Sequence, residues 1–332
     1  DELLVRLNDA LVGEVDGSAR RRAEYSTDAS TYRVLPRVVA YPKDSADVSA
    51  ALAVAREMGV PITSRGAGTS CAGNAVGEGI VLDFSRHMNK ILDIDPVART
   101  ARVQPGVIES ELQKAAAPHG LRFGPDPSTQ NRATFGGMIG NNACGPHAVA
   151  YGRTADNVHA MKVLLADGTE IDAGQGDLRV PGLKRIVDEH LAAIRVEMGR
   201  FKRQVSGYSL EHLLPENGSD LAKFLVGSEG TLGSVTEATL RLVPVAESPA
   251  LVVLGYPDQP SAADDVVPLL EFDPLAVEGV DAHLVEVVRR HKGSVPELPE
   301  GGGWLFIEIG AREGEDAAEV IRRAEALVAA SA

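Results

Sequence analysis

The sequence has few cysteines, fewer basic than acidic residues and no long apolar run, and each shortage excludes a class of protein. Its two cysteines, Cys71 and Cys144, form no C-x-x-C pair, so neither a disulfide framework nor a zinc or iron–sulfur site is expected. With 33 basic against 47 acidic residues, the formal net charge of −14 disfavours nucleic acid and anionic membranes as partners. An anionic ligand would therefore be held by backbone N–H groups and a few placed cations.

The chain also lacks the features that direct proteins to membranes. No stretch approaches the roughly 18 consecutive apolar residues of a membrane span, and the first residues, Asp1 to Leu4, lack the basic and apolar blocks of a signal peptide. We therefore expect a soluble, cytoplasmic protein. Its 332 residues, 44% of them hydrophobic, can bury one large core and allow two domains.

Helical and extended patterns alternate along the chain, which predicts an α+β fold. Apolar residues from Val48 to Met58 recur at helical spacing behind an Asp44 or Ser45 N-cap, and Gly59 ends this helix. Two extended runs flank Asp167-Gly168, which is a strong hairpin signal. One helix is expected over about 183–198, and a strand over 235–243.

The patterns divide the chain into three parts. Residues 1–33 are expected to be a lead-in segment, 34–244 a first domain, and 250–332 a second domain of β-α-β type, with a linker after Pro244. The second domain is small, its last helix keeps an apolar face to cover, and the chain begins without Met. We therefore expect a chain that is cut short at both ends.

A first glycine-rich stretch, "SRGAGTSCAG" at 64–73, has too little side chain to form a core. Its spacing does not match a dinucleotide-binding G-x-G-x-x-G motif that opens a helix, and no Gly-Lys-Ser/Thr of a Walker A loop follows. Successive N–H groups could form an anion-binding nest here, with Arg65 as a local cation and Thr69 and Ser70 as hydroxyl donors. Such a nest suits a pyrophosphate, and an ordinary glycine-rich turn is the alternative.

Two further stretches resemble the first in composition. "FGPDPSTQNRATFGGMIGNNACG", residues 123–145, reads as a long loop without secondary structure, anchored by Phe123, Phe135, Met138 and Ile139. "GSEGTLGSVTEATLRL", from Gly227 onward, again places glycines just before a strand. Three separated polar, glycine-rich loops on one globular chain indicate one long ligand that is contacted at several points.

The order of these motifs resembles a known family. "PKDSADVSAALAVAREMGVPITSRGAGTS", "VQPGV", the 123–145 stretch, "YGRTADNV" and "FLVGSEGTLGSVTEATLRL" resemble the FAD-binding domain of the vanillyl-alcohol oxidase and p-cresol methylhydroxylase (PCMH-type) superfamily. More narrowly, the chain is similar to the FAD-linked D-lactate and D-2-hydroxyglutarate dehydrogenases that are fused to an iron–sulfur part. The resemblance implies two α+β subdomains that bind FAD within 34–244, followed by the first part of a cap domain at 250–332.

The resemblance assigns cofactor contacts to three segments. The pyrophosphate is assigned to Arg65, Gly66, Ala67, Gly68, Thr69 and Ser70. The flavin and ribityl chain are assigned to Pro125, Asp126, Pro127, Ser128, Thr129, Gly136, Gly137, Gly140, Asn141, Asn142 and Gly145. The adenosine end or dinucleotide backbone is assigned to Glu229, Gly230, Gly233 and Val235. Many relatives carry a flavin-linked His at the position of Thr69, so non-covalent FAD is expected, and Cys71 and Cys144 are expected to be buried bystanders.

The implied activity is oxidation of a D-2-hydroxy acid, such as D-lactate or D-2-hydroxyglutarate, by hydride transfer to flavin N5. The His-x-Gly-Asp-Gly-Asn-type motif that supplies catalytic and metal-binding histidines in such enzymes is absent, and the eight histidines lack ligand spacing. We therefore assign no metal site and no catalytic base, not even to His147, which is the best-placed histidine for the flavin.

The resemblance also implies an electron-acceptor domain, iron–sulfur or other, in the full-length protein, and that acceptor could bring the protein to the inner membrane. Two other functions remain open. A UDP-N-acetylenolpyruvoylglucosamine reductase shares the FAD fold at similar length, although the 123–145 stretch fits it poorly. A flavin-binding module that no longer turns over is the second alternative.

Overall fold

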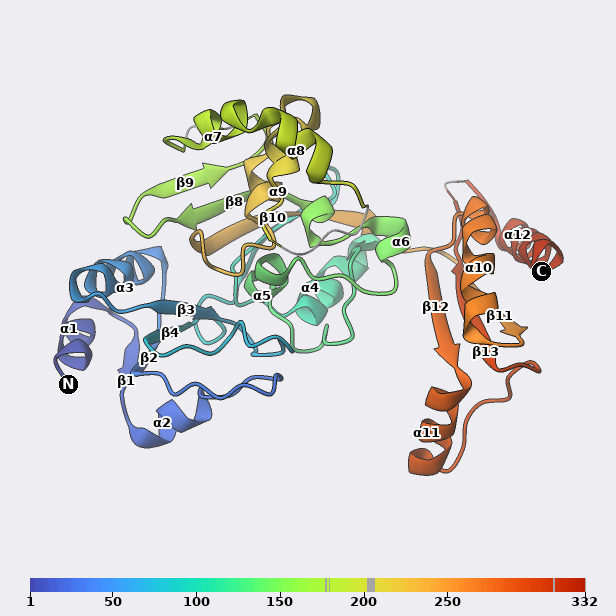
Figure 1. The fold of residues 1–332 in the computed structure, drawn as a ribbon, viewed down its shortest axis with the longest axis horizontal. Helices are drawn as coiled ribbons and strands as arrows, with labels where there is room; N and C mark the ends of the chain where they lie inside the picture. Colours follow the sequence, from blue (N-terminus) through green and yellow to red (C-terminus); the bar gives the residue numbers. More distant parts are fainter. Residues whose placement is uncertain (177, 179, 202–206, 313, 332) are drawn as a thin grey trace. The chain divides into compact units, whose positions relative to one another are not determined.

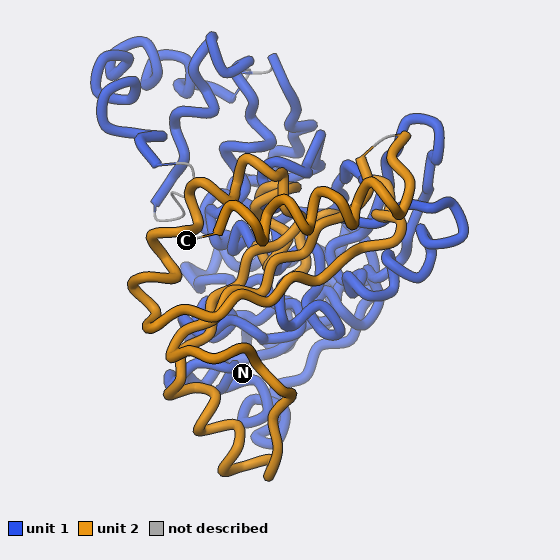
Figure 2. Tube along the Cα trace, turned by 90° about the vertical axis from the view of Figure 1, so that its right-hand side faces the viewer, with its two compact units in different colours: residues 1–123, 127–143, 153–243 blue, residues 124–126, 144–152, 244–332 orange. Residues whose placement is uncertain are grey.

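The structure is a computed structural model that describes residues 1–176, 178, 180–201, 207–312 and 314–331. Within it the chain folds into two compact units, which Figure 2 colours separately. Unit 1 comprises residues 1–123, 127–143 and 153–243, and unit 2 comprises 124–126, 144–152 and 244–332. Unit 2 therefore takes two short pieces from the long glycine-rich stretch in addition to the C-terminal part of the chain.

The first layer of unit 1 is a four-stranded sheet with the order β1-β2-β4-β3. Its strands are β1 (Glu14–Asp16), β2 (Val38–Tyr41), β4 (Ile80–Asp83) and β3 (Ile62–Arg65). The central β4 pairs in parallel with β2 and β3, and β1 pairs antiparallel with β2. Helices α1 (Glu2–Ala10) and α3 (Ser45–Met58) share one core with this sheet (Figure 1), while α2 (Ala19–Glu24) has no buried residue.

The N-terminal segment is part of this layer. Leu3 and Leu7 of α1 are fully buried against the α3 side of the core. Asp47 of α3 is also buried, and its carboxylate accepts hydrogen bonds from the amides of Val12, Gly13 and Lys43 at 2.8–2.9 Å. Residues expected to form only a lead-in thus complete the first sheet.

Helix α3 begins and ends as predicted. Asp44 is its N-cap, accepting from the amides of Ala46 and Asp47, and Gly59 ends it in the left-handed region at φ +62°. The hairpin around Asp167-Gly168 is also confirmed, because β8 (Val158–Leu164) and β9 (Glu170–Ala173) pair antiparallel across it.

The second layer of unit 1 is a six-stranded sheet. Its path is β5 (Ile91–Asp95), β6 (Thr100–Val103), β10 (Ser234–Pro244), β8 and β9, with β7 (Leu121–Phe123) also paired to β10. Side chains alternate along β10, so Ala238 and Leu240 enter the core while Glu237 and Arg241 point away from it. Helices α4 (Glu109–Ala116), α5 (Phe135–Asn141), α7 (Leu183–Glu189), α8 (Leu191–Glu197) and α9 (Leu221–Leu225) contribute to that core.

The structure corrects two of the expected elements. The helix expected over 183–198 is divided into α7 and α8, because His190 leaves helical geometry at φ −113°, ψ 14°. The stretch 123–145 is not a loop throughout, since it contains the two-turn helix α5. Thr134 caps α5, and Phe135, Met138 and Ile139, spaced i, i+3 and i+4, bury one face of it.

The C-terminal part of unit 2 is an antiparallel sheet with helices packed on one face. Its order is β11 (Ala250–Tyr256), β13 (Gly303–Ile309), β12 (Ala276–Asp281). Helices α10 (Gln259–Leu269) and α12 (Ala317–Ala330) share a core with Val252, Leu254 and Ile307 of the sheet, and α11 (Ala282–Lys292) follows β12 (Figure 1). The predicted α+β class is confirmed for both units.

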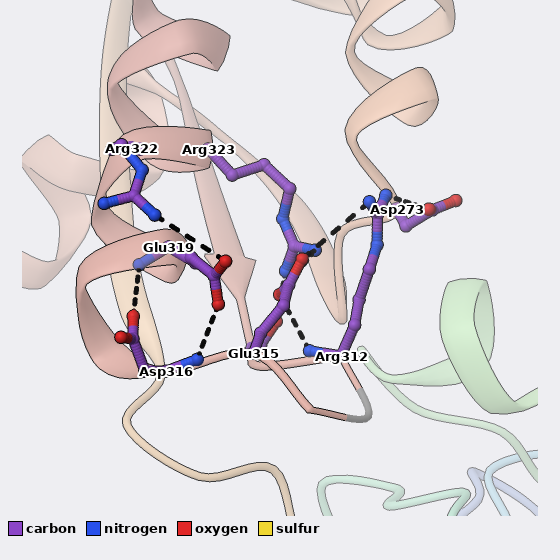
Figure 3. A network of polar contacts seen from close by, with 8 residues as sticks. Asp273, Arg312, Glu315, Asp316, Glu319, Arg322 and Arg323 are labelled. Carbon is purple, nitrogen blue, oxygen red and sulfur yellow. Dashed lines mark hydrogen bonds and ion pairs between the residues drawn. The ribbon is translucent and has the colours of Figure 1, made fainter.

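A polar network secures the start of α12 (Figure 3). Asp316 and Glu319 form a reciprocal capping box, and Glu315 pairs with Arg323 at 2.9 Å. Arg312 bridges this network to Asp273, which follows α10. No helix in the described ranges is long and apolar enough to cross a membrane.

Candidate functional site: a cavity between three glycine-rich segments

Unit 1 contains a cavity of about 350 Å³ where three glycine-rich segments meet. One segment follows β3, the second runs into α5, and the third precedes β10. Most of the predicted cofactor-binding residues line it: Arg65, Gly66, Ala67, Gly68, Thr69, Ser70, Pro127, Thr129, Gly136, Gly137, Gly140, Asn141, Glu229, Gly230, Gly233 and Val235. Segments separated by up to about 170 positions in the sequence therefore share one site.

The loop after β3 presents free backbone amides. It is not helical, and Gly68 turns it through the left-handed region at φ +68°. The amides of Ala67, Gly68, Thr69 and Ser70 make no hydrogen bond to any described part of the chain. Unsatisfied N–H groups that line a cavity are suited to an anionic ligand, as the sequence pattern predicts.

Two glycines permit the second segment to approach the others. A Cβ on Gly66 would lie 2.0 Å from Thr134 Oγ1, and one on Gly136 would lie 2.8 Å from the Cβ of Pro105. Since real Cβ atoms do not come so close to other heavy atoms, only glycine fits in these positions without a shift of the wall. The cavity therefore depends on close backbone packing between β3, Pro105 and the start of α5.

The third segment is hydrogen-bonded to the second. The amides of Gly227 and Glu229 donate to the carbonyls of Ile139 and Gly140 at 2.8 and 3.0 Å. Glu229 itself is in the left-handed region at φ +55°, which is unusual for a residue with a side chain. Ser234 Oγ lies 3.2 Å from Ser64 Oγ, so the third segment is also tied to β3.

Five predicted cofactor contacts do not line the cavity. Ser128 and Asn142 belong to unit 1, where Asn142 is buried, ends α5 at φ +49° and accepts from the amide of Ala155. Pro125, Asp126 and Gly145 belong to unit 2. Gly145 packs on the backbone of Asp126, where a Cβ would lie 2.1 Å from the carbonyl oxygen. Residues that neighbour cavity residues in the sequence thus do not always line the cavity themselves.

His147 also belongs to unit 2, together with its two carboxylate partners. Its Nδ1 lies 2.5 Å from Asp126 Oδ2, and its Nε2 lies 3.3 Å from Glu308 Oε2 on β13. The ring of Tyr151 stacks against it, with centroids 6.1 Å apart. Within the described residues, no cluster of three or more His, Cys, Asp or Glu side chains is arranged to hold a metal ion.

The structure corrects the expected burial of both cysteines. Cys71 is exposed and lines the cavity, and Cys144 is partly exposed. Cys71 lies in the turn-rich stretch after Ser70, outside any helix or strand that would bury it. Neither thiol is a packing residue of the core.

Several cavity residues were not among the predicted contacts. Thr134 and Ser228 lie within the glycine-rich stretches but were not assigned, whereas Pro105, Phe84 and Leu225 line the cavity from elements that the glycine pattern does not mark. One of them had a usable signal, since Thr134 precedes an apolar i, i+3, i+4 run as an N-cap does. Phe84 and Leu225 had no such signal, because the sequence does not distinguish an apolar residue that lines a cavity from one that is packed in a core.

Comparison with known proteins agrees with this geometry. Residues 36–174 match a family described as FAD binding domain. The chain is 33% identical over 352 residues to a D-2-hydroxyglutarate dehydrogenase of Pseudomonas putida, covering 97% of this chain and 34% of that protein. It is also 33% identical over 305 residues to a D-lactate dehydrogenase of Archaeoglobus fulgidus, covering 89% of this chain and 60% of that protein.

A solved structure of alkyldihydroxyacetonephosphate synthase superposes with a TM-score of 0.70 at 17% identity, covering 99% of this chain and 59% of that one. At this identity the likeness shows the fold. The chain spans only about a third of the length of the Pseudomonas relative. The predicted resemblance is confirmed, and so is FAD as the cofactor.

Proposed function

Since residues 36–174 match a family described as FAD binding domain, we propose that this protein is an FAD-dependent dehydrogenase of D-2-hydroxy acids and that its cavity holds the FAD. The observation that carries the proposal is the row of free amides at residues 67–70, set in a cavity lined by three glycine-rich segments. The residues present fit a dinucleotide, which has a central diphosphate and two aromatic ends.

Each segment has a proposed share of the cofactor. The amides of residues 67–70 would donate hydrogen bonds to the diphosphate oxygens, because no described group of the chain satisfies these amides. Pro127, Thr129 and residues 136–141 would contact the flavin and ribityl chain, and the segment that holds Glu229, Gly230, Gly233 and Val235 would contact the adenosine end or the dinucleotide backbone. Thr69 cannot form the covalent flavin bond made by a histidine, so the FAD would be bound non-covalently.

The substrate class rests on the dehydrogenase names of the relatives and is part of the proposal. When bound, FAD supplies the acceptor for the hydride that a 2-hydroxy acid gives up on oxidation. No side chain of this chain is proposed as the base, and His147 is already engaged by Asp126 and Glu308. The reductase alternative is not favoured, since the relatives named above are dehydrogenases.

We propose that the electrons leave through a separate acceptor, iron–sulfur or other, while a cytoplasmic location stays a prediction. The test of the whole proposal is an absorption spectrum of the purified protein, before and after anaerobic addition of D-lactate or D-2-hydroxyglutarate. A yellow protein whose flavin is released by acid and bleached by either substrate is the expected result.

Three other outcomes would contradict parts of the proposal. A yellow protein that ignores both substrates would leave the FAD site standing and reject these two hydroxy acids for this chain. A colourless protein that fails to take up added FAD would reject the cavity as its site. Bleaching by NADPH alone would favour the reductase alternative.

A further inference from the structure

Arg65 directs its guanidinium to backbone carbonyls. Nη1 donates to the carbonyl of Ala75 at 2.9 Å and lies 3.5 Å from that of Tyr25, while Nη2 donates to the carbonyl of Thr27 at 2.9 Å. No carboxylate pairs with it in the described ranges. Among the described residues that line the cavity, Arg65 is the only cationic side chain, and these hydrogen bonds direct its guanidinium to the main chain.

These carbonyls belong to two segments that adjoin the amide-bearing loop. One is residues 25–29, where the amide of Ala29 donates to the carbonyl of Gly68 at 3.0 Å. The other is Ala75, whose amide lies 3.4 Å from Asp28 Oδ2. The guanidinium therefore sits at the point where the N-terminal segment and both ends of the loop converge.

The surroundings of Arg65 hold the guanidinium in place. Its Cζ lies 5.0 Å from the ring centroid of Tyr25, within cation–π range. The hydroxyl of Tyr25 donates to the carboxylate of Asp83, whose Cα is the register partner of the Arg65 Cα in the parallel β3–β4 pairing. Burial, and then this hydrogen bond, raise the pKa of the Tyr25 phenol, so it remains a donor.

The loop folds directly over the guanidinium. A Cβ on Gly68 would lie 2.6 Å from Arg65 Nη2, and Gly68 has φ +68°. A displaced guanidinium would therefore leave the Gly68 peptide without its support. The orientation of that peptide decides where the neighbouring free amides point.

We propose that Arg65 is a positioning residue for FAD, which aligns the amides of residues 67–70 through the carbonyls of Tyr25, Thr27 and Ala75, and is not the cation that pairs with the diphosphate. The inference rests on the proposed function of this loop. A planar guanidinium has several N–H donors in fixed directions and can donate to three carbonyls at once. A lysine ammonium keeps the charge but lacks this planar arrangement of donors.

The experiment is an FAD fluorescence titration of the wild type, Arg65→Lys and Arg65→Ala, with Arg20→Lys as the matched control. Arg20 lies in α2, just before the carbonyl-bearing residues 25–29, and its side chain is 89% exposed. We expect both Arg65 variants to weaken FAD binding by about tenfold or more, from the loss of charge-assisted hydrogen bonds. Arg65→Lys would not rescue the loss, and Arg20→Lys would bind as the wild type does.

Two further readouts separate positioning from general damage. Methylguanidinium, but not methylammonium, should partly restore FAD binding to Arg65→Ala. In the ligand-free protein, NMR order parameters of the amides of residues 67–70 should fall in Arg65→Lys and stay unchanged in Arg20→Lys. Thermal unfolding of each variant checks that the fold is retained.

The failures are distinguishable. Binding by Arg65→Lys within about twofold of the wild type would overturn the positioning role and return Arg65 to the role of a phosphate cation, with the FAD site intact. A wild type that binds no FAD would overturn the proposed function. In that case unchanged order parameters in Arg65→Lys would overturn the inference as well.

Discussion

At the scale of single residues, Gly66 sets how closely the two sides of the cavity can approach. It is the first residue after β3, and the hydroxyl of Thr134 occupies the space that a side chain at position 66 would need. The sequence marks Gly66 only as one of several glycines in a polar stretch. The partner that makes it necessary lies 68 positions further along the chain.

We predict that Gly66→Ala destabilises the ligand-free protein by about 1–3 kcal/mol, because the new Cβ would clash with the side chain of Thr134 in a closely packed part of the cavity wall. The matched control is Gly137→Ala in α5, where a Cβ would meet Thr134 Oγ1 at an ordinary 3.5 Å. Since alanine is the better helix former, the control should keep or slightly raise stability. Thermal unfolding measures both, and equal melting temperatures would contradict the prediction.

Glu216 gives a pH-dependent prediction at the same scale. Arg195 binds its carboxylate through two contacts of 2.5 and 3.0 Å, and this hydrogen bonding lowers the pKa of Glu216 from its ordinary 4.5 to about 2. A lowered pKa stabilises the folded state above pH 4.5, and that contribution is lost as the pH falls through about 2.

Carbon-detected NMR titration of Glu216 should show this low pKa, and Arg195→Gln should return it toward 4.5. The control is Arg200→Gln, which removes the neighbouring pair of Arg200 with Glu197 and should leave Glu216 unchanged. A Glu216 that titrates near 4.5 in the wild type would show that the pair does not persist in solution.

At the scale of elements, helix α3 combines an N-cap, Asp44, and a C-terminal glycine, Gly59, with a face buried in the core. We predict that Asp44→Ala destabilises unit 1 by about 1 kcal/mol, because the amides of Ala46 and Asp47 lose their acceptor. Asp44→Ser retains a cap and should recover most of that loss. Urea unfolding followed by circular dichroism measures both variants, and an Asp44→Ala midpoint equal to that of the wild type would count against the cap.

Elements were predictable where caps and periodicity agreed, as in α3, and where turn residues separated two strands, as at Asp167-Gly168. Helix α5 escaped because its three glycines, Gly136, Gly137 and Gly140, have low helix propensity. Its helical state is maintained by burial of Phe135, Met138 and Ile139 in the core, which is a tertiary effect. The break between α7 and α8 carried no proline or glycine signal.

At the scale of the whole molecule, the two units have separate cores. The sheet and helices of unit 2 form a cluster of their own around Ile307, which is fully buried. We predict that Ile307→Ala costs unit 2 about 2–5 kcal/mol. Because the cavity is lined by unit 1 residues, FAD binding should persist.

Hydrogen exchange read by mass spectrometry tests this independence. Ile307→Ala should lose protection over β11, β12 and β13 while the strands of unit 1 keep theirs. The control is Ile321→Ala on α12, because Ile321 is 54% exposed and the loss of its side chain should change little. An equal loss of protection in both units would mean that the chain unfolds as one cooperative body.

The sequence by itself determined the α+β class, the main helices and hairpin, the cofactor family and most of the residues around the cavity. These features depend on local patterns: N-caps, apolar periodicity, turn pairs and glycine-rich loops, which act over a few positions. Only the tertiary structure decided that Pro125, Asp126 and Gly145 join unit 2, that Arg65 braces the loop through main-chain carbonyls, and that Thr134 fills the space at Gly66. Each of these depends on contacts between residues far apart in the chain, and the geometry of such contacts is set by packing rather than by any single local pattern.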